Sequence, residues 1–197
     1  MGSYDERLDH LLTQAARVFA DKGYHPTTMR DLAAASGMSL AGMYYYVRGK
    51  AELLQLIQER CFTRVLEGAE QAVAAARDPV ERLAAFIRHH VAFFARHMPE
   101  MKVLSHEAAS LSGEGRRRVN ASKRRYVDLL EALLKEAAPD EPAAERSAAA
   151  YALFGMMNWI YTWYDPAGPL DPVRLADLLT RIFLGGFVEA RTTAQGG

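Results

Sequence analysis

Residues 23–50, GYHPTTMRDLAAASGMSLAGMYYYVRGK, hold two short helical patterns separated by a tight-turn signal. The first pattern covers about residues 28–35 and the second about residues 39–47, with Ser36-Gly37 between them. Serine is a favoured N-cap residue, so Ser39 marks the start of the second helix. Two short helices joined by a turn that contains glycine are typical of a helix-turn-helix. The stretch therefore predicts this motif, whose second helix lies in the major groove of DNA.

The N-terminal part of the second predicted helix would face the base edges. Its residues are small or apolar, so the backbone could approach DNA closely and a thymine methyl could be contacted. Hydroxyls of tyrosine and threonine at the helix ends could reach phosphates, and a lysine that opens the next helix would act as a phosphate clamp. The candidate DNA-binding set is Thr27, Thr28, Arg30, Ser39, Leu40, Ala41, Gly42, Tyr44, Tyr45, Tyr46 and Lys50.

Two of these features also have a purely structural interpretation. The tyrosines at positions 44–46 could be core residues, but consecutive residues on a helix point about 100° apart and cannot all face inward. Some of the three phenols must therefore meet solvent or a partner. Thr28 and Asp31 have the spacing of a capping box, which is compatible with a phosphate contact at the same helix start.

Outside this stretch, almost every long segment shows apolar residues at helical spacing, and no run of alternating β-branched residues is present. The pattern predicts an all-α protein of about nine helices. Pro and Gly clusters separate the helices. The further predicted helices cover about residues 4–21, 50–76, 79–96, 100–111, 116–138, 143–164 and 171–193.

Composition and charge restrict the function classes. Half of the 197 residues are hydrophobic, and 24 basic residues balance 24 acidic ones. Residues 1–50 hold six basic and five acidic side chains, so DNA binding must come from local geometry and should show a modest salt dependence. The single Cys61 excludes an internal disulfide, and no apolar stretch approaches the ~20 residues of a membrane span. We expect a cytoplasmic protein without membrane contact.

The C-terminal part of the chain is rich in methionine and aromatic residues beside a few polar ones. Most of these must form a core, but such a mixture is also typical of an apolar ligand pocket with polar anchors. The candidate ligand-binding set is His90, Phe93, Phe94, His97, Arg124, Asn158, Trp159 and Trp163.

Other classes of site receive little support. No Gly-rich phosphate loop or nucleophile elbow is present, and the acidic residues are scattered over polar helix faces, so we expect no enzyme. His90 and His97 lie seven residues apart and His106 follows, but zinc sites show tighter paired spacing. We expect neither a metal nor a cofactor. A ligand-binding or adaptor bundle without DNA binding remains the alternative function.

The order GYHPTTMRDLAAASGMSLAGMYYYVRGKAELL resembles the DNA-binding region of TetR-type transcriptional regulators, over about residues 5–54. The resemblance implies a helix-turn-helix domain over residues 1–49 and a ligand-binding and dimerisation domain over residues 50–197. It also implies a homodimer that spans a palindromic operator. Carried over by position, the phosphate contacts are Thr27, Thr28, Tyr44, Tyr46 and Lys50, and Ala41 and Gly42 lie nearest the bases. The chain departs from the family at Val47, where phenylalanine is usual.

Residues 154–187 resemble the C-terminal helices of TetR-type regulators of fatty-acid, steroid and aromatic-acid catabolism. That resemblance implies a repressor released by an apolar acid or its acyl-coenzyme A thioester, with the last two long helices forming the dimer interface. Basic side chains could meet the nucleotide phosphates of such a ligand, or could form a solvated helix face. These are Arg116, Arg117, Arg118, Lys123, Arg124 and Arg125.

Overall fold

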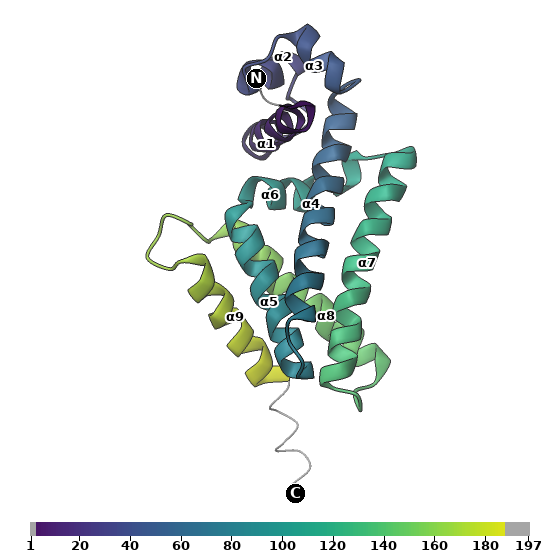
Figure 1. The fold of residues 1–197 in the computed structure, drawn as a ribbon, viewed down its shortest axis with the longest axis vertical. Helices are drawn as coiled ribbons and strands as arrows, with labels where there is room; N and C mark the ends of the chain where they lie inside the picture. The colour runs from purple at the N-terminus through teal and green to yellow at the C-terminus, as the bar shows by residue number, and fades with distance from the viewer. Residues whose placement is uncertain (1–2, 188–197) are drawn as a thin grey trace, which may run out of the picture. The chain divides into compact units, whose positions relative to one another are not determined.

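The computed structural model describes residues 3–187, and within them every regular element is helical (Figure 1). The predicted all-α class, with an N-terminal helix-turn-helix and a C-terminal helical part, is confirmed. The elements are α1 Tyr4–Lys22, α2 Met29–Ser36, α3 Leu40–Tyr46, α4 Lys50–Ala74, α5 Pro79–Arg96, α6 Met98–His106, η1 Ala108–Ser110, α7 Gly113–Ala137, α8 Ala143–Asn158, η2 Trp159–Thr162 and α9 Pro172–Phe187. The predicted continuation of the last helix to Thr193 lies outside the described residues.

The chain forms two compact units, and the long helices α4 and α7 each contribute to both. The first unit contains the described residues up to Thr63 together with His97–Ser122, and the second contains Arg64–Arg96 and the described residues from Lys123 on. The packing units therefore interleave along the sequence. The functional boundary at residue 49 stays a prediction.

The first unit is built around α1. This helix starts with a capping box, in which the Ser3 hydroxyl accepts the Glu6 N–H and the Glu6 carboxylate accepts the Ser3 N–H. It ends at Gly23, whose φ of 87° favours glycine. The buried face of α1 packs with α2, α3, the start of α4, and also α6. The resulting core takes in Val103, Leu111 and Val119, so α6 and the start of α7 belong to the same core as the helix-turn-helix.

The second unit is centred on α5, which packs against α8 and runs alongside α9 (Figure 1). Pro79 occupies the first turn of α5, after Asp78 has capped it by accepting the N–H groups of Val80 and Glu81. One face of α5 is almost completely buried and carries Leu83, Ala84, Phe86, Ile87, His90, Val91, Phe94 and Ala95. A histidine in the middle of such a face needs hydrogen-bond partners.

The approach of α4 to α5 depends on Gly68. A Cβ atom added at this position would lie 2.3 Å from Cε1 of His89 and 2.8 Å from its Nε2. The His89 ring is held by a hydrogen bond to the Val65 backbone and by the Phe93 ring, whose centroid is 5.9 Å away. Burial lowers the pKa of His89, and its buried Nε2 has no hydrogen-bond partner among the described residues. The ring therefore has little room to move away from α4.

We expect Gly68→Ala to lower the free energy of unfolding by about 1 to 2 kcal/mol, because overpacking of the His89 ring outweighs the better helix propensity of alanine. The measurement is urea denaturation followed by circular dichroism. In a His89→Ala background the clash is absent, so the same substitution should instead stabilise by up to about 1 kcal/mol. Equal effects in the two backgrounds would contradict the steric explanation.

Candidate nucleic-acid interface and effector site

The two helices of the predicted motif are delimited by local hydrogen bonds. Thr28 caps α2: its hydroxyl accepts the Asp31 N–H at 3.2 Å, and the Asp31 carboxylate accepts the Thr28 N–H at 2.7 Å. The Lys22 ammonium, 2.6 Å from Asp31, together with Thr28 holds the pKa of that carboxyl well below its usual range. Helix α2 ends at Gly37 in the left-handed region, with φ 66°. The predicted helix-turn-helix is confirmed.

Helix α3 presents most of its surface to solvent. Ser39 caps it by accepting the Gly42 N–H at 3.0 Å, and Met43 is the buried residue of its seven. Tyr44 and Tyr45 are 50% and 75% exposed, while Tyr46 is half-buried. The expectation that three consecutive tyrosines cannot all be core is thus confirmed. Exposed phenols on a short helix can donate to phosphate oxygens at low cost.

Several other predicted DNA contacts are also accessible. Ser39, Leu40 and Ala41 at the start of α3 are exposed, as are Thr28 and Arg30 at the start of α2. Gly42 is half-buried, and a Cβ atom there would lie 3.1 Å from the Ser39 Oγ that caps the helix. These residues therefore lie on the two helix starts that the motif brings together, and their contacts with DNA stay predictions.

Thr27 does not fit its predicted role as a phosphate contact. The residue is 2% exposed, its hydroxyl donates to the Gly23 carbonyl at 2.6 Å, and its N–H donates to the Tyr24 carbonyl at 3.3 Å. Both donors are thus used inside the loop between α1 and α2. Thr27 stabilises this loop, because a buried hydroxyl must satisfy its hydrogen bonds within the protein.

Lys50 also has a different environment from the one predicted for a phosphate clamp. Its ammonium donates to the carbonyls of Tyr24, His25 and Thr27 at 2.8, 2.9 and 2.9 Å, and lies 4.5 Å from the centre of the Tyr24 ring. An ammonium has three N–H donors, and here all three are used. Lys50 therefore ties the first turn of α4 to the loop that precedes α2. A phosphate contact would require one carbonyl to be given up.

Lys50→Met should lower the free energy of unfolding by about 1 to 2 kcal/mol and weaken DNA binding, because charge-assisted bonds to three carbonyls are lost while the aliphatic stem is kept. Urea denaturation and DNA titration would be measured on the same samples. Lys50→Arg keeps the charge but replaces the compact ammonium by a planar guanidinium. Its unfolding free energy and its DNA affinity should therefore lie between those of the wild type and of Lys50→Met. Unchanged stability with lost DNA binding would support the phosphate clamp instead.

The loop before α2 has a second anchor, which sequence reasoning missed. The Glu107 carboxylate, just after α6, accepts the Tyr24 N–H at 3.2 Å and the Ser110 hydroxyl at 2.6 Å. Burial raises the pKa of Tyr24, and the negative charge of Glu107 is a smaller cause in the same direction. Because 83 residues separate Tyr24 from Glu107, no local pattern could have predicted this contact.

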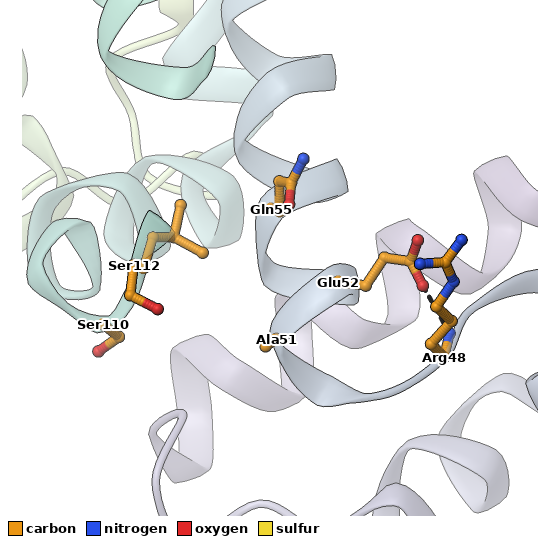
Figure 2. Close-up of a pocket in the computed structure, with 7 residues that line it drawn as sticks. Arg48, Ala51, Glu52, Gln55, Ser110 and Ser112 are labelled. Atoms are coloured by element: carbon orange, nitrogen blue, oxygen red, sulfur yellow. Dashed lines mark hydrogen bonds between the residues drawn. The ribbon is translucent and has the colours of Figure 1, made fainter. Parts of the chain in front are cut away.

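A pocket of about 230 Å³ lies in the same unit, between the start of α4 and the residues that lead into α7 (Figure 2). In Figure 2, Gln55 and Glu52 on α4 lie on one side and Ser110 and Ser112 on the other. The Glu52 carboxylate accepts the Arg48 N–H, which links the residues before α4 to its first turn. The lining mixes polar and charged side chains with Ala51 and Leu111 and contains no aromatic residue, unlike the apolar pocket predicted from the C-terminal aromatic residues.

In the second unit, two polar side chains, those of Tyr126 and Asn158, meet at His90, which is only 1% exposed. Its Nε2 lies 3.1 Å from Asn158 Oδ1, and its Nδ1 lies 3.0 Å from the Tyr126 hydroxyl. An amide oxygen can only accept, so Nε2 carries the proton and Nδ1 accepts the phenol O–H. Each of the two ring nitrogens is therefore satisfied.

Aromatic rings surround this polar trio of His90, Tyr126 and Asn158. The His90 ring centroid lies 4.8 Å from that of Phe94, and 5.8 Å from those of Tyr126 and Phe154. Burial lowers the pKa of His90 to about 3, with the neighbouring His89 as a smaller cause in the same direction. The imidazole is therefore neutral at physiological pH, and the trio offers hydrogen bonds without charge.

The structure brings together only part of the predicted ligand-binding set. His90, Phe94 and Asn158 meet, and Phe93 packs edge-on against Phe94 with centroids 5.1 Å apart. Tyr126 and Phe154, which sequence reasoning counted only among the aromatic residues, prove to be central. Their positions on α7 and α8 could not be related to α5 by periodicity alone.

The other predicted residues lie elsewhere. Trp159, at the start of η2, and Trp163, just after it, are 61% and 55% exposed, so they do not line a buried pocket in this structure. Arg124 is exposed on α7. His97 is the N-cap residue of α6 and belongs to the first unit. The exposed tryptophans need a different explanation.

A capped helix-turn-helix with an exposed second helix, continued by a helical unit with a polar trio among aromatic rings, defines a transcriptional regulator of the helix-turn-helix class. Residues 11–57 match the model of bacterial regulatory proteins of the tetR family, and residues 76–187 match the tetracyclin repressor-like C-terminal domain. The chain belongs to the TetR family. No helix among the described residues has the length and apolar character needed to cross a membrane.

Relatives and solved structures support this assignment over most of the chain. The HTH-type transcriptional repressor KstR2 of Mycolicibacterium smegmatis is 25% identical, with 94% of this chain and 92% of KstR2 covered. The structure of AibR in complex with isovaleryl coenzyme A and operator DNA is 33% identical, has a TM-score of 0.79, and covers 89% of this chain and 97% of that chain. A TetR-family regulator from Bordetella parapertussis is 25% identical with a TM-score of 0.87, over 95% of this chain and 98% of that chain.

Proposed function

We propose that the protein is a homodimeric repressor that binds a palindromic operator. A small-molecule effector with an apolar acyl group, an acyl-coenzyme A thioester, releases it from this operator. The observation that carries the DNA-binding part is the exposed N-terminal face of α3, where Ser39, Leu40 and Ala41 can approach base edges. The repressor KstR2 and the operator complex of AibR support this assignment. The adaptor alternative offers no reason for a capped recognition helix with exposed phenols.

The polar trio around His90 supports an uncharged anchoring group on the effector. The Tyr126 hydroxyl could donate to a carbonyl oxygen if the ligand displaced its bond to His90, and the amide N–H groups of Asn158 are donors that its bond to His90 does not use. A carboxylate in the same place would be buried beside a neutral imidazole, and an unpaired buried charge costs several kcal/mol. The carbonyl of a thioester therefore fits better than the free acid, in keeping with the isovaleryl coenzyme A bound by AibR.

The nucleotide part of such a ligand carries phosphates and must stay near solvent. Helix α7 carries four exposed cations: Arg116 and Arg117 in the first unit, and Lys123 and Arg124 in the second unit, which also holds His90. Arg118 is paired with Glu114 at 2.6 Å, and Arg125 lies 3.8 Å from Glu70, so these two are partly neutralised. A phosphate contact by Lys123 and Arg124 is part of the proposal, and a solvated helix face is the competing interpretation.

Exposed apolar side chains on α8, η2 and α9 support the dimer. Tyr151, Gly155 and Trp159 are spaced four apart on α8 and its 3-10 extension, and all three are exposed, with open space above Gly155. Leu178 and Ile182 form a similar exposed pair on α9. Large apolar side chains in such rows are typical of a protein contact, and we assign them to the second copy of the chain.

Release follows from a difference in effector affinity between two conformations. Helix α4 is continuous from Lys50 to Ala74, so it starts at the loop of the helix-turn-helix and reaches the residues that pack on α5. An effector that displaces α5 or α7 would shift this helix. Two recognition helices would then no longer match half-sites about one helical turn apart.

A DNA gel-shift with the region upstream of the chain's own gene tests the proposal. The intact protein should shift this DNA, and isovaleryl coenzyme A or a longer acyl-coenzyme A should abolish the shift, whereas the matching free acid should act only at much higher concentration. Free coenzyme A is the control for the nucleotide part. No shift with any upstream DNA would favour the adaptor alternative.

A further inference from the structure

Three tyrosine rings from the two ends of the DNA-binding region meet at its surface. The centroid of the Tyr4 ring, at the start of α1, lies 4.9 Å from that of Tyr46 and 6.0 Å from that of Tyr45. Tyr45 and Tyr46 are themselves edge to face, with centroids 5.2 Å apart. We call these three rings the tyrosine clasp. All three belong to the first compact unit.

Helix α3 has few other anchors at this end. It is only seven residues long, and Met43 is its buried residue, with Val47 buried immediately after it. Tyr45 is 75% exposed, so the core does not restrict its side chain. Within residues 3–187, the aromatic rings that contact the Tyr45 ring are those of Tyr4 and Tyr46. The Tyr45 orientation therefore depends on the clasp.

Tyr4 is well placed to act as the fixed member. It is the first residue of α1, directly after the Ser3 N-cap, whose reciprocal bonds with Glu6 hold the helix start. Tyr4 is itself 49% exposed, so burial in a core does not account for its ring contacts. Edge-to-face and offset ring pairs are favourable beyond the area that they bury.

We propose that Tyr4 is a positioning residue for DNA recognition: its ring holds the side chains of Tyr45 and Tyr46 in the orientation in which their phenols bind phosphates. The proposal rests on the proposed function, since it presumes that these phenols contact DNA. Its physical basis is preorganisation, because a side chain that is ordered before binding loses less conformational entropy on binding. The ring of Tyr4 matters in this account and its hydroxyl does not.

The test uses the full-length protein and a duplex that the wild-type protein selects from random DNA. Tyr4→Ala should weaken binding to this duplex about fivefold per half-site, or roughly 25-fold for a dimer on two half-sites. Tyr4→Phe keeps the ring and should bind within about twofold of the wild type. Equal losses for both variants would mean that the Tyr4 hydroxyl contacts DNA directly, which would overturn the positioning role.

A double-mutant cycle separates positioning from a general loss of structure. In a Tyr45→Phe, Tyr46→Phe background the phenol hydroxyls are gone, so Tyr4→Ala should cost little further affinity. A full additional loss in that background would show that Tyr4 acts on the fold and would refute the proposal. If the wild-type protein selects no duplex, the proposed function fails and the clasp fails with it; if it selects one and Tyr4→Ala binds normally, only the clasp is wrong.

Discussion

Trp159→Glu combined with Ile182→Glu should convert the protein to a monomer and weaken operator binding by about 100-fold or more. Both side chains are more than half exposed, at 61% and 55%, so the substitutions do not disturb the core of one chain. In the proposed dimer they would bury two like charges per copy against an apolar partner, which is costly without pairing. Two linked half-site contacts gain about 10² to 10⁴ in avidity over one, and a monomer loses this gain.

Light scattering after size-exclusion chromatography gives the mass of the double variant in solution, and titration with operator DNA gives its affinity for the operator. Val173→Glu is the matched control, because Val173 is 60% exposed on α9 but lies nine residues before Ile182, on the opposite side of the helix. The control should remain dimeric and bind normally. A dimeric mass for the double variant would place the interface on another surface.

Acidification from pH 7.5 to 4.5 should cost the wild-type protein about 3 kcal/mol of unfolding free energy through His90 alone. In the folded state burial lowers the pKa of His90 to about 3, whereas the unfolded chain has the ordinary value near 6.5. Between these values the unfolded state binds a proton that the folded state does not. The contribution is therefore complete above pH 6.5 and is lost as the pH falls toward 3.

The comparison is His90→Gln, which keeps a polar side chain beside Tyr126 and Asn158 but cannot titrate in this range. Urea denaturation at several pH values should show a shallower acid loss for this variant, with the difference from wild type growing by about 1.4 kcal/mol per pH unit below 6.5. Parallel curves for wild type and His90→Gln would contradict a buried neutral imidazole.

The DNA-binding motif was predictable because its signals are local. Thr28 and Asp31 form their capping box over three residues, Gly37 supplies the left-handed turn, and Ser39 caps α3 through the N–H three residues on. Each contact forms between neighbours along the chain, so a short window of sequence contains all the groups involved. Helix geometry likewise predicted that the tyrosines at positions 44–46 could not all be buried, and the structure shows that Tyr44 and Tyr45 are the exposed ones.

Most departures from prediction involve contacts between distant parts of the chain. Thr27 is an exception, because its hydroxyl donates to the carbonyl of Gly23, only four residues before it. The three carbonyls that Lys50 binds lie 23 to 26 residues before it, which turned an expected DNA contact into a link within the fold. His90 meets Tyr126 and Asn158 across 36 and 68 residues. Composition predicted an aromatic core with polar anchors, but it could not say which aromatic residues would meet.

Helix α8 illustrates the limit most clearly. It is apolar on several sides, so periodicity does not distinguish its buried Leu153 and Met157 from its exposed Tyr151. The sequence by itself determined the all-α class and the helix-turn-helix with its caps, since hydrogen bonds between near neighbours define them. Only the tertiary structure decided which aromatic side chains surround His90 and which, like Trp159, face outward, because packing between helices distant in sequence selects the buried face.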